Sequence, residues 1–312
     1  MFDQIYALIK SFEKIIIIRH MNPDYDAYGS QFGLYYALKE AFPNKTILLD
    51  GDDNDSNFYN VKMDHLSEKD YENSLVILVD QSSLLMLKDE NFRCASKMII
   101  IDHHESTPDF GDVVLIRPNY SSASELVTEF LFTEGLPITE QSANALFIGI
   151  VGDSNRFLYS GTSANTFKMC EILIESGADI IADYKIMQKE ETENQKRFKG
   201  FILSSFIIEG DVAYNIVSKE ERSKYGIDAF FSSRGSVNLL SGIINTKAFV
   251  NFTETDDSKY YVEIRSKEIP VVNVAKAFGG GGHELACGTT IGSFGQISNI
   301  IKALNEEVNK SA

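Results

Sequence analysis

Residues 14–26 read KIIIIRHMNPDYD, a run of isoleucines followed by a histidine and two aspartates. Isoleucine is β-branched, and a short run of this kind suits a strand that is buried on both faces. Asn22 and Pro23 come next and keep the following residues out of a helix. The stretch therefore predicts a buried strand with polar residues in an extended loop beyond its end.

The same pattern recurs along the first half of the chain. Short runs rich in Ile, Val and Leu occupy residues 46–49, 74–79 and 97–101, and residues 31–41 have the spacing of an amphipathic helix. Strands that alternate with helices predict an α/β fold in which an N-terminal parallel sheet is covered by helices. In such sheets, ligand groups collect beyond the carboxyl ends of the strands.

Three further helices are expected in the first part of the chain, at residues 122–135, 139–150 and 163–176. The part beyond residue 200 predicts a smaller domain of mixed α+β type, with strands at 201–208, 212–217, 248–253 and 260–264 and a helical segment at 237–243. Between the halves, residues 184–199 are polar and contain no glycine or proline, as in a helical connector. We expect an N-terminal α/β domain over 1–184, a helical linker over 185–200 and a C-terminal α+β domain over 201–312.

Charge and cysteine content restrict the function. The chain of 312 residues has 29 lysines and arginines against 45 aspartates and glutamates, a net charge of −16. This balance argues against a surface that neutralises long duplex nucleic acid, although a short anionic substrate remains open. Three widely spaced cysteines and the lack of a long apolar N-terminal stretch predict a cytoplasmic protein with no membrane segment. The oligomeric state is open, with a homodimer possible.

Three short blocks gather histidines and carboxylates at the ends of predicted strands. They are HMNPDYD at residues 20–26, VDQS at 79–82 and DHH at 102–104. Any one of these side chains alone is more often structural or solvated than a metal ligand, but their joint occurrence at one sheet edge favours a metal site. Asp50, Gly51, Asp52 and Asp53 also follow a strand, and a solvated turn is the better interpretation there.

The spacing of these residues suggests how two ions could be held. In an extended loop, Asp24 and Asp26 can reach different ions, and Asp80 has two oxygens with which to bridge both. His103 and Asp153 can complete the second centre. Mixed imidazole and carboxylate ligands suit Mn²⁺ better than Ca²⁺, so two Mn²⁺ ions are expected, with Mg²⁺ or Co²⁺ as substitutes.

The order HxNPDxD, VDxS, DHH and GDSNRF resembles the DHH phosphoesterase family. The resemblance implies that one ion is bound by His20, Asp24 and Asp80, and the other by Asp26, Asp80, His103 and Asp153. It also implies that His104 faces the scissile phosphate as a catalytic residue together with Asp80, and that Asp102 orients its neighbours.

A second motif lies near the C-terminus, where residues 278–283 read FGGGGH. Glycines let backbone amides approach an anion closely, but a glycine run alone is as often a flexible turn. Together with the strand around Arg265, the motif resembles the DHH-associated C-terminal domain of the oligoribonuclease branch. The resemblance implies that Arg265, Gly281, Gly282 and His283 bind the substrate's distal phosphate or nucleotide.

The expected activity is hydrolysis of short oligonucleotides to mononucleotides, or of 3′-phosphoadenosine 5′-phosphate to AMP, by a hydroxide held between two metal ions. Short oligonucleotides, dinucleotides and phosphoadenosine phosphate are therefore the expected substrates. A phosphodiesterase for cyclic dinucleotides or their linear products uses the same metal motifs and stays open. An inorganic pyrophosphatase or exopolyphosphatase is a second alternative, which the Arg265 strand and the glycine block disfavour. A third is an inactive nucleotide-binding module, which the full ligand set disfavours.

Overall fold

The structure is a computed structural model that describes residues 1–53, 61–81, 83–105, 110–188 and 191–310. The chain divides into two compact units, Met1–Lys189 and Glu190–Ala312. The predicted linker 185–200 overlaps the end of helix α7 (Ile180–Met187) in the first unit and the start of helix α8 (Glu193–Ser205) in the second. Residues 189 and 190 of that linker, and Ser82 of the VDQS block, lie outside the described residues. Among the described helices, none is long and apolar enough to cross a membrane.

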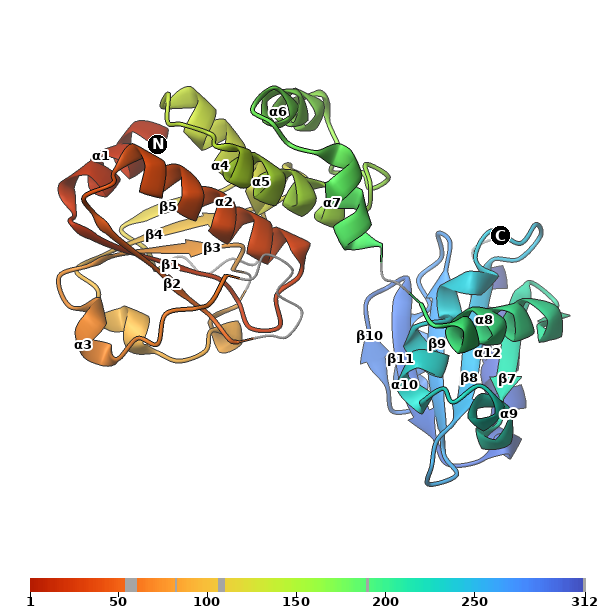
Figure 1. Cartoon of the computed structure of the whole chain (residues 1–312). Coiled ribbons are helices and arrows are strands. Elements are labelled where there is room, and N and C mark those ends of the chain that lie inside the picture. The colour runs from red at the N-terminus through yellow and green to blue at the C-terminus, as the bar shows by residue number, and fades with distance from the viewer. Residues whose placement is uncertain (54–60, 82, 106–109, 189–190, 311–312) are drawn as a thin grey trace. The chain divides into compact units, whose positions relative to one another are not determined.

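The first unit is built on a five-stranded parallel sheet, which confirms the predicted α/β class (Figure 1). The strand order is β2-β1-β3-β4-β5. The bounds are β1 (Lys14–Ile18), β2 (Thr46–Asp50), β3 (Leu75–Val79), β4 (Lys97–Asp102) and β5 (Val113–Ile116). Strand β5 was not expected from the sequence, because it is short and lies between polar segments.

Helices cover both faces of this sheet (Figure 1). One face packs against α1 (Phe2–Ser11), α2 (Tyr25–Ala41), α4 (Ala123–Thr133) and α5 (Glu140–Asp153), with α6 (Ala164–Glu175) and α7 against α5. The other face packs against α3 (Glu68–Tyr71) and the short 3₁₀ helices η1 (Leu84–Met86) and η2 (Asn91–Cys94). Ile15 and Ile17 belong to the first core and Ile16 and Ile18 to the second, which explains the uninterrupted isoleucine run.

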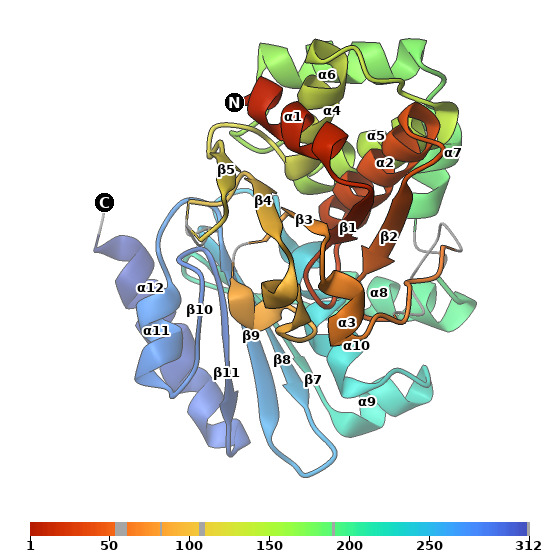
Figure 2. The ribbon, with the colours of Figure 1, turned by 90° about the vertical axis from the view of Figure 1, so that its left-hand side faces the viewer.

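The second unit is a mixed sheet with helices on both faces, as the α+β prediction requires (Figure 2). The strand order is β10-β11-β9-β8-β7-β6, and only β7 and β8 pair in parallel. The strands are β6 (Ile207–Glu209), β7 (Val212–Val217), β8 (Ala248–Glu254), β9 (Tyr260–Ser266), β10 (Gly281–Gly282) and β11 (Ala286–Ile291). One face packs against α11 (Val272–Ala277) and α12 (Ile297–Asn309), and the short η4 (Phe294–Gln296) comes directly before α12. The other face packs against α8, α10 (Ala229–Arg234) and η3 (Val237–Leu240). Helix α9 (Lys219–Lys224) lies beside α10.

Three local predictions were wrong. Helix α2 begins at Tyr25 rather than near residue 31, because Asp24 caps it by accepting hydrogen bonds from the amides of Asp26 and Ala27 at 3.0 Å. Residues 201–205 continue helix α8 instead of forming a strand, and the strand is limited to β6. The spacing of buried Phe198 and Ile202 is helical, and the capping box at Thr192 starts that helix. The helix expected at 237–243 is the single 3₁₀ turn η3.

One buried carboxyl in α7 makes the stability of the first unit depend on pH. Asp183 is 2% exposed, and its Oδ2 has no hydrogen-bond partner among the described residues. Burial, with a smaller effect of Asp179, raises the pKa of Asp183 to about 7. A carboxyl with a raised folded-state pKa contributes stability at low pH that is lost as the pH rises through about 7.

We therefore expect Asp183→Asn to raise the melting temperature at pH 8 by about 4 °C, or about 1–2 kcal/mol. Near pH 4 the aspartate is protonated in the folded protein, so the variant should melt within about 1 °C of the wild type. Calorimetry at the two pH values checks this. An equal difference in melting temperature at both pH values would show that packing, and not ionisation of Asp183, separates the variant from the wild type.

Candidate metal centre

The candidate ligands come from neighbouring strand ends and two helix ends. His20 follows β1, Asp80 follows β3, and His103 follows β4, and these three strands are adjacent in the sheet. Parallel neighbours end at the same edge, so their following residues meet there. The helices add Asp24 and Asp26 at the start of α2, and Asp153 as the last residue of α5. The expected extended loop at residues 24–26 is therefore a capped helix N-terminus.

All six predicted metal ligands, together with Asp102 and His104, lie in clusters of ligand-type atoms. Within each cluster the atoms lie within 4.8 Å of one another. The clusters are His20, Asp24 and Asp80; Asp26, His103 and Asp153; and Asp80, Asp102, His103 and His104. Each of the first two contains imidazole and carboxylate donors, which is the donor set that first-row divalent metals accept.

Asp80 belongs to two of the clusters and connects His20 with His103. Its Oδ2 is 3.4 Å from His20 Nε2, and its Oδ1 is 3.8 Å from His103 Nε2. The side chain is buried, and Oδ1 has no hydrogen-bond partner among the described residues. Asp80 has a φ of +52°, a left-handed conformation that Asp tolerates better than most residues. The carboxylate therefore presents one oxygen to each histidine.

The two histidines are oriented through their Nδ1 atoms. His20 Nδ1 lies 2.8 Å from the carbonyl of Met21, and His103 Nδ1 lies 3.3 Å from the carbonyl of Tyr120. A carbonyl oxygen can only accept, so each Nδ1 carries the proton, and in the neutral ring Nε2 presents its lone pair. Nε2 of His103 is buried without a hydrogen-bond partner among the described residues and lies 3.2 Å from Asp153 Oδ2. A lone pair facing carboxylates needs a cation or a proton between them, so these residues fit a metal ion.

The pKa values of the cluster report its excess of negative charge. Burial, followed by repulsion from Asp80, raises the pKa of Asp26 well above its usual value. Burial also raises the pKa of Asp153 to about 6, against the opposing effect of His103. Burial lowers the pKa of His20, but the hydrogen bond to Asp80 and other nearby groups outweigh it and raise that pKa to about 9. Bound cations would relieve this crowding.

Helix α4 stabilises Asp26 in a way that sequence reasoning missed. The carboxylate accepts hydrogen bonds from the amides of Ala123 at 2.7 Å and Ser124 at 2.8 Å, which lie in the first turn of that helix. The helix N-terminus favours negative charge and fixes both oxygens. The signal was present in the Ser-Ser-Ala-Ser sequence at 121–124, which is typical of a helix start.

Asp50 and Asp52 do not form the solvated turn that was predicted. Asp50 is buried and accepts a hydrogen bond from Tyr71. Asp52 accepts from the buried Arg19 guanidinium at 2.6 Å, and from the amide of Asn22 at 3.0 Å. Arg19 and Asp52 therefore hold the residues on both sides of His20 in place. The sequence hid this pairing, because Arg19 follows β1 and Asp52 follows β2, more than thirty residues later.

His104 is held by Asp102 and lies beside Asp80. Its Nδ1 is 2.8 Å from Asp102 Oδ1 and 3.6 Å from Asp80 Oδ1. The hydrogen bond to Asp102 raises the pKa of His104 to about 9, against the lowering effect of burial. Asp102 also accepts from the amide of His103 at 2.7 Å, so it orients both histidines that follow it.

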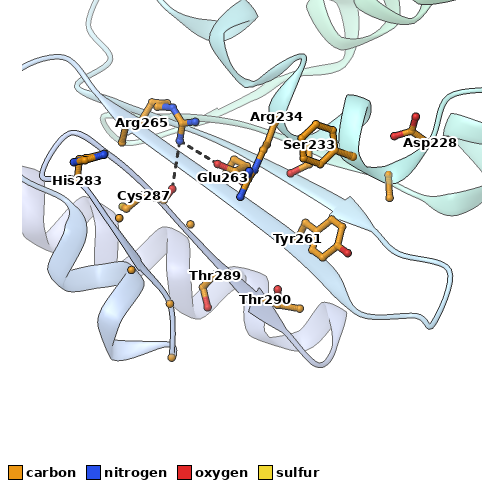
Figure 3. A pocket seen from close by; sticks show the side chains of 18 residues that line it. Asp228, Ser233, Arg234, Tyr261, Glu263, Arg265, His283, Cys287, Thr289 and Thr290 are labelled. Carbon is orange, nitrogen blue, oxygen red and sulfur yellow. Dashed lines mark hydrogen bonds and ion pairs between the residues drawn. The ribbon is translucent and has the colours of Figure 1, made fainter. Parts of the chain in front are cut away.

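In the second unit, the predicted substrate-binding residues line one cavity of about 1130 Å³ (Figure 3). They are Arg265, Gly281, Gly282 and His283. Arg265 lies on β9, and its Nη1 donates to Glu263 Oε2 at 3.1 Å and to the carbonyl of Ile264 at 2.9 Å. The guanidinium is thereby fixed on the sheet. Its Nε and Nη2 donate to no acceptor within the part of the chain that the structure describes, so they can donate to an anion.

The glycine block has a specific steric requirement at one position. Gly282 has a φ of +131°, and an added Cβ would lie 2.7 Å from Cys287 Cα and 2.8 Å from the carbonyl oxygen of Ala286. Both neighbours are backbone atoms and cannot move cheaply. At Gly281, by contrast, an added Cβ meets nothing within 4 Å, and φ is not in the left-handed region.

We expect Gly282→Ala to lower the melting temperature of the second unit by about 5 °C or more, at a cost of about 2 kcal/mol. The matched variant Gly281→Ala should stay within about 1 °C of the wild type. Calorimetry on the full chain measures both. Similar losses in the two variants would mean that the glycines matter for flexibility in general and not for the contact at Gly282.

Comparisons with known proteins place the chain in a family. The DHH family, N-terminal domain, matches residues 14–150, and the DHHA1 domain matches residues 212–310. The chain is 33% identical to a probable bifunctional oligoribonuclease and PAP phosphatase NrnA of Streptococcus mutans, over 97% of each chain. It is also 33% identical to the bifunctional oligoribonuclease and PAP phosphatase NrnA of Bacillus subtilis, over 96% of each. Among solved structures, an exopolyphosphatase-related protein from Bacteroides fragilis has a TM-score of 0.79 and 24% identity, covering 99% of this chain and 95% of its own.

Proposed function

This chain belongs to the DHH family, and from that membership we propose that it hydrolyses short oligoribonucleotides to mononucleotides and 3′-phosphoadenosine 5′-phosphate to AMP. It is a phosphate ester hydrolase. The observation that best supports the proposal is the position of Asp80, whose two oxygens face His20 and His103 from between the two ligand clusters.

Two Mn²⁺ ions are the proposed cofactors, with Mg²⁺ or Co²⁺ as substitutes. His20, Asp24 and Asp80 would hold one ion, and Asp26, Asp80, His103 and Asp153 the other. When bound, such ions lower the pKa of water and neutralise charge on phosphoryl oxygens. The mixed nitrogen and oxygen donors support this choice over Ca²⁺.

The protein's own residues orient and assist the reaction. Asp102 holds Nδ1 of His104 at 2.8 Å, which fixes the ring beside Asp80. We assign His104 to the scissile phosphate, where it would stabilise developing charge or assist the leaving oxygen. Arg265 and His283 would hold the distal nucleotide, with Gly281 and Gly282 allowing close approach of the backbone. The net charge of −16 supports short substrates over long duplexes.

A manganese-supplemented assay with four substrates tests this function. The ribodinucleotide pApA and phosphoadenosine phosphate should both be turned over, each giving AMP as a product. Cyclic di-AMP and pyrophosphate should react far more slowly. Turnover of cyclic di-AMP alone would favour the cyclic dinucleotide phosphodiesterase, turnover of pyrophosphate alone would favour a pyrophosphatase, and no turnover at all would contradict the proposed activity.

A further inference from the structure

The cavity of the second unit has a second arginine that the assignments above leave unused. Helix α10 contributes Phe230, Ser233 and Arg234 to the lining of the cavity, to which the glycine block also belongs. In Figure 3, Arg234 points toward Glu263 on β9. Arg265, on the same strand, also donates to Glu263. The cavity therefore has a second basic side chain, Arg234, close to the predicted phosphate-binding residue Arg265.

Glu263 connects the two arginines through separate oxygens. Arg234 Nε donates to Oε1 at 3.1 Å, and Arg265 Nη1 donates to Oε2 at 3.1 Å. The Glu263 side chain is only 13% exposed, so both contacts are shielded more than an ordinary surface pair. Two guanidinium groups share one carboxylate, which leaves this part of the cavity with a net positive charge. The other acidic side chain of the lining, Asp228, lies farther along the cavity and caps α10 through the amide of Phe231.

Arg234 keeps its terminal nitrogens available. Its guanidinium carbon is 5.3 Å from the centre of the Phe230 ring, and only its Nε is used by Glu263. Among the described residues, none accepts a hydrogen bond from Nη1 or Nη2, and the side chain is 64% exposed. An arginine that is oriented by a ring and a carboxylate, with its outer edge toward a cavity, is arranged to receive an anion.

We propose that Arg234 is a second phosphate-binding residue, which acts with Arg265 to select substrates whose distal nucleotide carries a terminal phosphate monoester. A monoester has three terminal oxygens and up to two negative charges, so it can accept from both guanidinium groups. An internal phosphodiester has two free oxygens and one charge. This inference rests on the proposed function and specifies the end of the substrate that the second unit recognises.

The test is binding of AMP, which carries such a phosphate, measured by calorimetry in metal-free buffer with EDTA. Arg234→Gln should weaken AMP binding about tenfold, since a charge-assisted hydrogen bond is lost. Arg234→Lys should give an intermediate loss, because it keeps the charge without the fork. The matched control is Arg197→Gln, which removes another exposed arginine that pairs with a glutamate, Glu193, on α8 outside the cavity. It should bind AMP within twofold of the wild type.

Two results would overturn the inference: AMP binding by Arg234→Gln equal to that of the control, or no measurable AMP binding by the wild type. Melting curves of the variants exclude a folding defect as the cause of a loss. A parallel turnover assay with phosphoadenosine phosphate separates this proposal from the proposed function. If AMP binding depends on Arg234 but the wild type does not turn over the substrate, the proposed function fails and the inference stands. If the wild type turns over the substrate and Arg234→Gln does so with an unchanged KM, the proposed function stands and the inference about Arg234 fails.

Discussion

Replacement of Asp80 by asparagine is expected to lower kcat/KM for pApA by about a thousandfold or more, equivalent to about 4 kcal/mol of transition-state stabilisation. Asparagine tolerates the φ of +52° at this position and has nearly the same shape. It cannot, however, supply an anionic oxygen to each of the two clusters. The loss of activity should therefore come from the charge and not from a disturbed fold.

The same substitution should weaken the response of the protein's stability to metal. Asp80 places one oxygen beside His20 and the other beside His103, so its charge belongs to both proposed ion sites. The increase in melting temperature that Mn²⁺ gives the wild type should largely disappear in the variant.

A matched control is Asp3→Asn, which removes an aspartate whose side chain is 81% exposed on α1, outside the site. It should keep wild-type turnover and the wild-type response to Mn²⁺. If Asp80→Asn retained activity, or lost it together with its folded structure, the bridging role of Asp80 would be wrong.

Replacement of Arg265 by alanine is expected to raise KM for pApA about 10- to 100-fold while kcat changes little. Arg265 is fixed by Glu263, Ile264 and the carbonyl of Cys287, so its fork is already oriented before substrate binds. A charge-assisted contact of this kind contributes about 1.5–3 kcal/mol to binding. Because Arg265 is assigned to the distal nucleotide, its loss should weaken binding and not the chemical step.

Steady-state kinetics over a wide substrate range measure both constants. Arg265→Lys should recover part of the loss, since it keeps the charge but not the planar geometry. Arg93→Ala, which removes an exposed arginine of the first unit, is the control and should leave KM unchanged. A fall in kcat at constant KM would show that Arg265 acts in the chemical step and would refute its assignment to binding of the distal nucleotide.

The central strands and the cluster of candidate ligands were predictable, because both depend on local sequence. Residues 15–18 are all isoleucine, so neither face of this part of the strand carries a polar side chain, and burial on both faces follows from the composition. In a parallel sheet the residues after adjacent strands share an edge, and this rule predicts that His20, Asp80 and His103 lie together.

What the sequence could not supply were contacts between distant segments. The amides that hold Asp26 come from α4, almost a hundred residues away, and Arg19, which follows β1, donates to Asp52, which follows β2. The early start of α2 was predictable in principle, since Asp24 is a good capping residue, but Asn22-Pro23 favoured a loop. Around residue 201 an apolar run resembled a strand, while the tertiary packing of Phe198 and Ile202 favours the helix.

The most direct test of the account is anomalous diffraction from crystals of the protein grown with MnCl₂. We predict two manganese peaks, one ligated by His20, Asp24 and Asp80 and one by Asp26, Asp80, His103 and Asp153, with Asp80 contributing an oxygen to each. The account would be contradicted by a map without manganese at these residues, or by one in which Asp80 touches neither ion.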